Sequence, residues 1–340
     1  MNIVFYLHSP ATYQFDFFLF LIKKKIKVNV IYQNKRIANF NWKFKNYKWV
    51  HFLDKNNPPS KIEKVLKKTK PNAVIIGGYK MNNESVFQNN KNFLILYWLE
   101  KLEKKFFIKS FIRFIILKKK LSNVDGILAI GNQAKSYYKK FHDNVINLPY
   151  SIKNVNYDLS KKKYNLNFLF VGQLINRKGL DFLIDTIIKI KSKKYKFTVV
   201  GEGNLKLKLN KIKNVDFNHY NFLNKKKLSS IYKKNSILIV PSRFDGWAVV
   251  VIEAMLNGLA IISNKNVGAF KEYIKHGING REAKLNAHSL FNQIKFFEKN
   301  KNKIKEYGLA NQKIFTKNLS NADLAANKLK FFLNKNQIKF

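Results

Sequence analysis

Short apolar segments that alternate with helix-like segments are the feature of this chain that most restricts its fold. In the first half, apolar runs such as residues 2–8 (NIVFYLH) and 73–76 (AVII) each lead through a turn into a segment of helical periodicity. A second series begins at residue 167 and includes residues 196–200 (KFTVV). Strand–helix–strand units of this kind form parallel sheets that are covered by helices on both faces. The sequence therefore predicts an α/β protein with two parallel sheets.

The two series are separated by a polar, lysine-rich stretch at residues 151–166, which we expect to link two domains. With 340 residues the chain is long enough for two domains of ordinary size. We expect the N-terminal domain at residues 1–150 and the C-terminal domain at residues 167–318. Residues 319–340 should form a C-terminal helix, which could pack back on the N-terminal domain.

The chain carries a formal net charge of +45 and contains no cysteine. Without cysteine there can be no disulfide and no thiolate metal site, which is compatible with a reducing cytoplasm. Only five of the 65 basic residues are arginines, at positions 36, 113, 177, 243 and 281. Proteins that read nucleic acids use arginine for bidentate contacts, and the lysines here are spread along the whole chain, so we disfavour nucleic acid as a partner. Two explanations of the charge stay open: a lysine-rich composition, and attraction to an anionic membrane surface.

Residues 106–118 (FFIKSFIRFIILK) are strongly apolar, with Lys109 and Arg113 four positions apart. The segment could be a core-packing helix with its basic residues toward solvent, or a basic amphipathic helix that lies on a membrane. The chain has no run of about 18 uncharged apolar residues, and its N-terminus lacks the features of a signal peptide. We therefore expect a cytoplasmic protein, for which this helix raises the option of peripheral binding to the inner membrane face.

Glycine-bearing turns follow several predicted strands, at the edge where parallel sheets bind their ligands. The first strand of the second series ends at Gly172 and is followed by two adjacent cations, Arg177 and Lys178, at a helix start. Two cations and the first amides of a helix all attract anions, so this arrangement suits a diphosphate. The next strand ends at Gly201 and Gly203, where backbone without side chains can approach ligand phosphates closely.

A third stretch, residues 241–258 (PSRFDGWAVVVIEAMLNG), contains a turn at Asp245 and an apolar helix with one carboxylate, Glu253, in its middle. A carboxylate is costly to bury unless a ligand or a partner accepts it. At the helical rise per residue the two carboxylates would lie up to about 12 Å apart on roughly the same side. There they could hold the two ends of an extended polyol, with an anion at the helix start between them. Asp245 could instead cap the helix.

Together these motifs (VGQLINRKG, VVGEGN and PSRFDGWAVVVIEAMLNG, followed by VGAFKEYIKHGINGREA) resemble the donor domain of glycosyltransferase family 4, over residues 167 to 283. The N-terminal segments HSPATYQFDFF, IIGGY and VDGILAIG…LPY are similar, more loosely, to the acceptor domain of family members that build surface polysaccharides. The resemblance implies the GT-B fold, with two Rossmann-like domains whose parallel sheets face a central cleft.

The resemblance also implies a role for each matching residue. Arg177 and Lys178 would bind the diphosphate of a UDP- or GDP-sugar. Glu253 would hold the ribose hydroxyls, and Asp245 the hydroxyls of the donor sugar. The further donor-binding positions that it implies are Gly172, Gly201, Gly203, Gly246, Trp247, Ala248 and Val249.

Three positions depart from the family pattern. Asp245 replaces a glutamate, Ala248 replaces the second glycine of the turn, and Gln173 stands where an arginine is common. The first two bear on the geometry of the sugar end of the site and leave the nucleotide end unaffected.

The reaction implied is transfer of a sugar, with retention of anomeric configuration, to a lipid-linked or polysaccharide acceptor. Arg177, Lys178 and the helix dipole would stabilise the leaving diphosphate, so the resemblance implies no metal and no other cofactor. The candidate acceptor residues follow strands of the first series: Ser9, Thr12, Tyr13, Tyr79 and Glu100. Three alternatives stay open: a GT-B nucleotide-sugar epimerase, a basic protein that binds nucleic acid or membranes without catalysis, and a degenerate transferase retained as a partner subunit.

Overall fold

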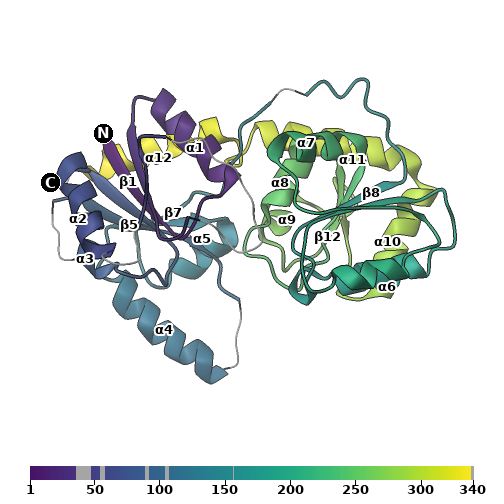
Figure 1. Ribbon diagram of the computed structural model, residues 1–340, viewed down its shortest axis with the longest axis horizontal. Helices are drawn as coiled ribbons and strands as arrows, with labels where there is room; N and C mark the ends of the chain where they lie inside the picture. The colour runs from purple at the N-terminus through teal and green to yellow at the C-terminus, as the bar shows by residue number, and fades with distance from the viewer. Residues whose placement is uncertain (36–46, 54–57, 89–91, 104–106, 156, 338–340) are drawn as a thin grey trace. The chain divides into compact units, whose positions relative to one another are not determined.

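The computed structural model describes residues 1–35, 47–53, 58–88, 92–103, 107–155 and 157–337. Arg36, Phe106 and the side chain of Lys109 lie outside this part. The chain forms two compact units, each with a parallel sheet between helices (Figure 1). Unit 1 consists of Met1–Lys153 and Ala322–Phe340, and unit 2 of Asn154–Asn321. The predicted α/β class with two parallel sheets is confirmed.

Unit 1 is built on seven parallel strands in the order β3-β2-β1-β4-β5-β6-β7. Its central strands are apolar along their length and are buried on both faces, as expected for a sheet with helices on each side. The strands are β1 Asn2–Leu7, β2 Lys27–Tyr32, β3 Val50–Phe52, β4 Ala73–Gly77, β5 Leu94–Glu100, β6 Gly126–Ile130 and β7 Val145–Asn147. The helices are α1 Thr12–Lys23, α2 Pro58–Thr69, α3 Ser85–Gln88, α4 Phe107–Leu121, α5 Asn132–Tyr138 and α12 Ala322–Gln337.

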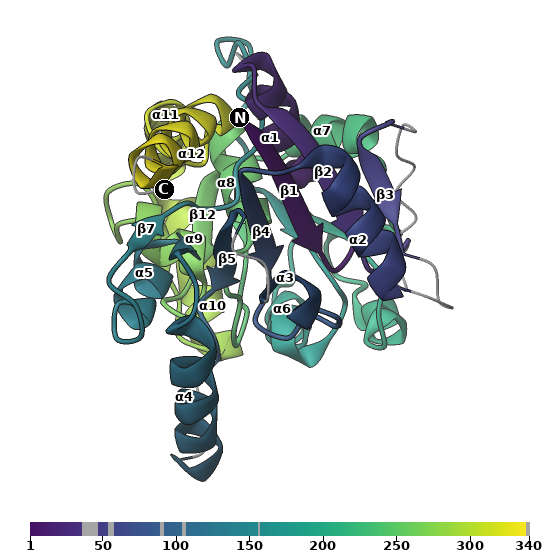
Figure 2. The ribbon, with the colours of Figure 1, turned by 90° about the vertical axis from the view of Figure 1, so that its left-hand side faces the viewer.

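The last helix, α12, belongs to unit 1 although it follows unit 2 in the sequence. It lies beside α1 in both views (Figures 1 and 2). Leu329 and Leu333 are fully buried there, and Asp323 forms an ion pair of 2.9 Å with Lys24. The apolar side of α12 thus completes the layer that covers one face of the sheet.

The lysine-rich stretch 151–166 does not run free between the units. The boundary lies after Lys153, and the residues that follow pack on unit 2. Lys162 Nζ donates to the carbonyl oxygens of Tyr232 at 3.3 Å and Asn257 at 3.1 Å, and burial lowers its pKa to about 8. Leu166 is part of the core. The lysines of residues 151–166 predict an exposed linker, but the apolar residues between them attach this stretch to unit 2.

Unit 2 is built on six parallel strands in the order β10-β9-β8-β11-β12-β13. The strands are β8 Asn167–Val171, β9 Lys196–Val200, β10 Asp216–Tyr220, β11 Ile237–Ile239, β12 Ala260–Ser263 and β13 Arg281–Glu282. The helices are α6 Leu180–Ile188, α7 Lys225–Lys234, α8 Val249–Leu256, α9 Gly268–Tyr273, α10 Ala287–Lys299 and α11 Lys301–Thr316, with 3-10 turns η1 Asn176–Lys178 and η2 Lys206–Lys211.

Each sheet reverses its strand order at one point. In unit 1 the chain proceeds outward from β1 to β2 and β3, then returns to place β4 on the other side of β1. In unit 2 it proceeds from β8 to β9 and β10, then returns to place β11 beside β8. Loops on the two sides of such a point leave the sheet toward opposite faces, which opens a crevice at the carboxyl ends of the strands. The topology therefore predicts one ligand crevice in each unit.

Helix α4 departs from the core-packing interpretation of its sequence. Leu117 and Leu121 are buried and attach its last turns to unit 1, but Phe111, Ile112 and Ile116 are more than half exposed. Figures 1 and 2 show the helix extending away from the sheet of its unit. The core-packing interpretation is therefore wrong for most of its apolar residues. Among the described residues, no helix combines the length and apolar character that crossing a bilayer requires.

Candidate functional site

The crevice that the topology predicts in unit 2 falls between the loop after β8 and the loop after β11, which approach each other very closely. Gly179 has a φ of +71°, and a Cβ there would lie 1.9 Å from the carbonyl oxygen of Pro241. A Cβ at Gly201, after β9, would lie 1.9 Å from the carbonyl oxygen of Gly172. Only glycine fits at such approaches. The three predicted motifs therefore meet at one edge of the sheet, at the point where its strand order reverses.

Lys178 and Asp245 form an ion pair across this crevice. Their side chains are 20% and 11% exposed, so a diphosphate that enters the crevice can still reach the lysine. Asp245 is fixed through its backbone: its amide donates to the carbonyl of Asn266 and its carbonyl accepts from the amide of Gly268, both at 3.1 Å. An entering diphosphate would compete with Asp245 for Lys178, which would release the carboxylate to accept hydroxyl groups.

Asp245 does not cap the helix that follows, so the capping interpretation is wrong. Helix α8 begins after Ala248, and no side chain among the described residues caps it. Ala248 has a φ of 65°, a left-handed conformation that costs a residue with a Cβ about 1–2 kcal/mol. The first amides of a helix lack partners within the helix, so the start of α8 can bind an anion. The neighbouring Trp247 is fully buried against Tyr273, while Val249 is half-buried.

Glu253 lies in the middle of α8, and its carboxylate is held by a residue that the sequence does not reveal. The hydroxyl of Tyr232, on α7, donates to Oε2 of Glu253 at 2.7 Å. Tyr232 is buried, and burial together with the adjacent Glu253 raises its pKa well above the ordinary value, so it remains a proton donor. Tyr232 thus orients the carboxylate. Nothing in the sequence links the two residues, because they come from different helices.

Arg177 lies on the same loop as Lys178 and is bonded to the loop after β11. Its Nη1 donates to the carbonyl of Phe244 at 3.0 Å, and its own carbonyl accepts from the amide of Arg243 at 2.9 Å. These bonds fix the backbone of the two cations at the mouth of the crevice.

Arg243 is a second residue that the sequence analysis missed. Its guanidinium makes two bonds to Asp181, at 2.7 and 2.5 Å, contacts the carbonyl of Asn176, and lies 3.9 Å from the ring centre of Phe182. Burial raises the pKa of Asp181, but the bonds from Arg243 outweigh it and the pKa is lowered overall. Arg243 therefore clamps the loop that carries Arg177 and Lys178. The scarcity of arginine in this chain is the signal that could have identified it.

We expect Arg243→Lys to weaken binding of the UDP used as a probe by about fivefold. Lysine keeps the positive charge, but it cannot make the paired bonds of the guanidinium to Asp181 or stack on Phe182. The loop that carries Arg177 and Lys178 would therefore shift. Because the pair is partly exposed, the cost should be about 1 kcal/mol, which lowers the melting temperature by about 2–4 °C in a domain of this size. Calorimetry and thermal unfolding measure the two effects.

The matched control is Arg281→Lys. Arg281, on strand β13, lies 3.8 Å from the ring centre of Phe296 and donates to Gln293 at 2.8 Å, so its guanidinium has an environment similar to that of Arg243. It should lower the melting temperature similarly and leave UDP affinity unchanged. If both variants lose UDP affinity equally, Arg243 has no specific role in positioning the cationic loop.

In unit 1 the candidate acceptor residues lie at the carboxyl ends of the neighbouring strands β1, β4 and β5, where Glu100 is the last residue of β5. The rings of Tyr13 and Tyr150 have centres 4.6 Å apart. Tyr150 also hydrogen-bonds Glu100, and burial, Tyr13 and Glu100 raise the pKa of Tyr150 well above its ordinary value. Tyr13 and Glu100 thus form one cluster through Tyr150, which ends the segment LPY and was not predicted as a site residue.

The other three candidates have separate surroundings. Ser9 Oγ lies 3.0 Å from Nδ1 of His8, and Thr12 is the first residue of α1. The carbonyl of Tyr79 accepts from Nζ of Lys120 at 2.5 Å. Tyr79 lies in a groove beside α4.

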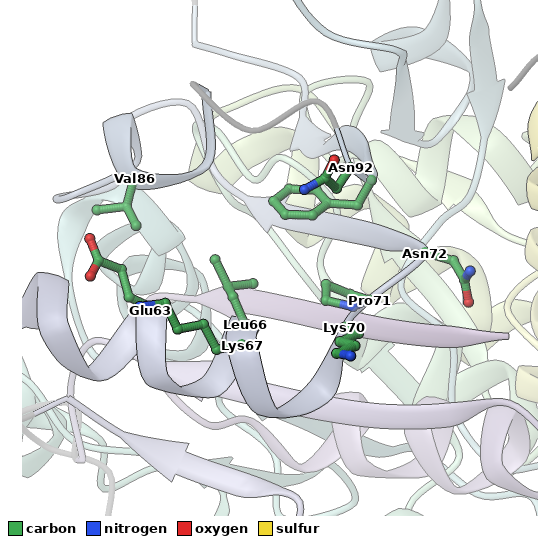
Figure 3. Close-up of a pocket in the computed structure, with 9 residues that line it drawn as sticks. Glu63, Leu66, Lys67, Lys70, Pro71, Asn72, Val86 and Asn92 are labelled. Carbon is green, nitrogen blue, oxygen red and sulfur yellow. The ribbon is translucent and has the colours of Figure 1, made fainter.

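A different groove of unit 1, with a volume of about 760 Å³, lies beside α2 (Figure 3). Lys70 and Asn72 precede β4, and Asn92 precedes β5, so these residues mark the amino ends of the strands. Ligands of parallel sheets bind at the opposite edge. We therefore do not assign this groove to the acceptor.

Comparisons with known proteins found relatives by sequence and by fold. Residues 155–314, most of unit 2, match the model of the family Glycosyl transferases group 1. The chain is 32% identical over 172 residues to an uncharacterized glycosyltransferase of Methanocaldococcus jannaschii (48% of this chain, 47% of that protein). It is 27% identical over 164 residues to an α-1,4-N-acetyl-D-galactosaminyltransferase of Campylobacter jejuni, named for its undecaprenol diphosphate-linked substrate (46% of this chain, 45% of that protein).

The chain spans less than half the length of the curated relatives that it matches. Similarity to solved structures extends further. HepE of Anabaena, solved with UDP-glucose, matches with a TM-score of 0.73 at 14% identity over 98% of this chain and 100% of that chain. This likeness shows the fold, and the GT-B architecture of two Rossmann-like units is confirmed.

Proposed function

We propose that the chain is a retaining, family 4 glycosyltransferase that moves a sugar from a UDP- or GDP-sugar to a lipid-linked or polysaccharide acceptor. The observation that carries the proposal is the close approach of the loops after β8, β9 and β11 at the carboxyl edge of the unit 2 sheet. Arg177, the Lys178–Asp245 ion pair and the start of α8 belong to these loops, and Glu253 follows in the middle of α8, an arrangement that suits a nucleotide sugar. The family match over 155–314 supports the transferase class, and HepE, solved with UDP-glucose, supports the donor class.

Each group of the proposed donor has a partner. The ribose hydroxyls bind Glu253, whose carboxylate Tyr232 orients. The diphosphate lies between the start of α8 and the cations Arg177 and Lys178, and the sugar hydroxyls bind Asp245. We propose that the glycines at 172, 201, 203 and 246 let the backbone approach the ligand, while Trp247, Ala248 and Val249 shape the turn before α8.

The reaction follows from this binding mode. The bond between the anomeric carbon and the diphosphate oxygen breaks, and a bond from the acceptor hydroxyl oxygen to that carbon forms on the same face. The hydroxyl proton passes to the departing phosphate oxygen, so no protein nucleophile takes part. The departing group gains negative charge, which Arg177, Lys178 and the helix dipole stabilise. We propose that these cations make a metal ion unnecessary.

On the acceptor side we propose that the cluster of Tyr13, Tyr150 and Glu100 binds glycan hydroxyls, together with Ser9, Thr12 and Tyr79. Half-buried tyrosines offer flat apolar faces and hydroxyl donors, which suit sugar rings. The name of the Campylobacter jejuni relative specifies a lipid diphosphate-linked glycan, which supports the same acceptor class here. If the acceptor is lipid-linked, we propose that the protein acts at the cytoplasmic face of the inner membrane, to which it binds peripherally.

Calorimetric titration with a panel of UDP- and GDP-sugars tests the proposal. We expect one nucleotide sugar to bind with one site per chain and the free nucleoside diphosphate to compete with it. Adding an extract of membrane lipids should then release nucleoside diphosphate. Absence of binding across the panel would overturn the proposal, and a sugar epimerised without an acceptor would favour the epimerase alternative.

A further inference from the structure

A groove of about 390 Å³ separates α4 from the loop that follows β4 in unit 1. The loop contributes Tyr79, Lys80 and Glu84, and the helix contributes Ile112, Arg113, Ile116 and Lys120. It lies at the carboxyl end of β4, at the reversal point of the sheet, where unit 1 is expected to bind a ligand.

The lining of this groove carries more positive than negative charge. Lys120 forms an ion pair with Glu84, whose other oxygen accepts from the hydroxyl of Tyr97 at 2.6 Å. The carboxylate is therefore fully engaged. Arg113 Nη2 donates to the backbone carbonyl of Glu103 at 2.7 Å, and Lys80 lies over the ring of Tyr79. Among the described residues neither cation is paired with a carboxylate, so the positive charge of both is available to an anion. Arginine in particular matches the oxygens of a phosphate with its planar fork.

The rest of the groove wall is apolar and continues onto the open surface of α4. Ile112 and Ile116 are 52% and 54% exposed, and the adjacent Phe111 and Ile115 are 59% and 52% exposed. These four side chains form one stripe along the middle turns of the helix. Lys118 and Lys119 follow in the last turns, on the same exposed side. Such a stripe next to lysines suits the boundary between lipid chains and anionic headgroups.

We propose that this groove binds the phosphate of an anionic membrane lipid, while the stripe of Phe111, Ile112, Ile115 and Ile116 enters the bilayer between the lipid chains. A ligand with an anionic phosphate joined to long apolar chains satisfies both halves of the surface at once. A soluble anion would leave the apolar stripe in water, and a protein partner would not require cations beside it. The inference deepens the proposed function, since it states how the enzyme reaches a membrane-bound acceptor.

Binding to vesicles tests this site. Wild-type protein should co-sediment with vesicles of phosphatidylglycerol and phosphatidylcholine far more than with phosphatidylcholine alone. Ile112→Ser/Ile116→Ser should weaken that binding at least tenfold at unchanged charge, because both side chains leave the lipid. Arg113→Gln should weaken it about fivefold, as loss of one basic contact predicts.

Two control variants separate the site from the general charge of the chain. Leu207→Ser removes an exposed apolar side chain of unit 2, and Arg281→Gln removes one positive charge there. Both should bind vesicles like the wild type. If the controls lose binding equally, or if the isoleucine variant retains it, the proposal is overturned. Millimolar inorganic phosphate is a further test. If it releases the protein from the vesicles as effectively as Arg113→Gln does, the groove is a site for free phosphate and the proposal is overturned.

A titration with nucleotide sugar on the same variants keeps this inference apart from the proposed function. Loss of vesicle binding with intact donor binding supports the site at α4. If the α4 variants still bind vesicles and still bind the nucleotide sugar, only the inference about α4 is removed. Absence of donor binding in every variant counts against the transferase proposal alone.

Discussion

Glu253→Ala is expected to weaken binding of UDP or GDP by about 100-fold. In the proposed donor complex the carboxylate accepts bonds from two ribose hydroxyls. Hydrogen bonds to a charged group contribute about 1.5–3 kcal/mol each, so their loss corresponds to about two orders of magnitude in affinity. Calorimetry with UDP and GDP measures the change directly.

The alanine variant should also be less stable, which complicates a simple interpretation. Removal of the carboxylate leaves the buried hydroxyl of Tyr232 without its acceptor, at a cost of about 1–3 kcal/mol. Adding Tyr232→Phe to Glu253→Ala should therefore restore stability but not nucleotide affinity. Tyr232→Phe alone should weaken binding only about fivefold, since the carboxylate remains but loses its orientation. Affinity that returns with stability in the double variant would show that Glu253 has a structural role only.

The fold could be predicted because its signals are local. Apolar runs that end in turns and alternate with helical segments are sufficient to identify two parallel sheets. The sequence does not predict strands β3 and β13, because three and two residues are too few to display a period. Helix α4 was ambiguous because its apolar side chains do not face the core, and burial cannot be inferred from hydrophobicity alone.

The site was predictable only where a residue lies within a motif. Gly172, Lys178 and Asp245 stand next to turns or helix starts, and Glu253 stands out as the one carboxylate of an apolar helix. Tyr232 and Arg243 act through contacts that depend on the packing of α7 against α8 and of α6 against the loop after β11. Such pairings join positions far apart in sequence without any spacing rule. The two residues that orient the proposed site were therefore found only from the coordinates of their contacts.

Lys178→Met is expected to lower the rate of sugar transfer by about 10²–10³-fold. The variant removes a cation from the place where the departing diphosphate gains charge, and loss of one such stabilising group typically has this effect. It also leaves Asp245, only 11% exposed, without its cation. We expect a loss of stability of about 1–3 kcal/mol from this uncompensated carboxylate.

The double variant Lys178→Met/Asp245→Asn separates the two effects. Without either charge no uncompensated ion remains, so the melting temperature should return toward that of the wild type, while transfer stays slow. The matched control is Lys196→Met, which breaks the 2.9 Å ion pair with Asp216 at the amino ends of β9 and β10. That pair lies at the edge opposite the crevice, so transfer should be unaffected. If sugar transfer recovers together with stability in the double variant, the Lys178–Asp245 pair serves only to stabilise the loop. The charge that assists the leaving diphosphate must then come from Arg177 and the start of α8.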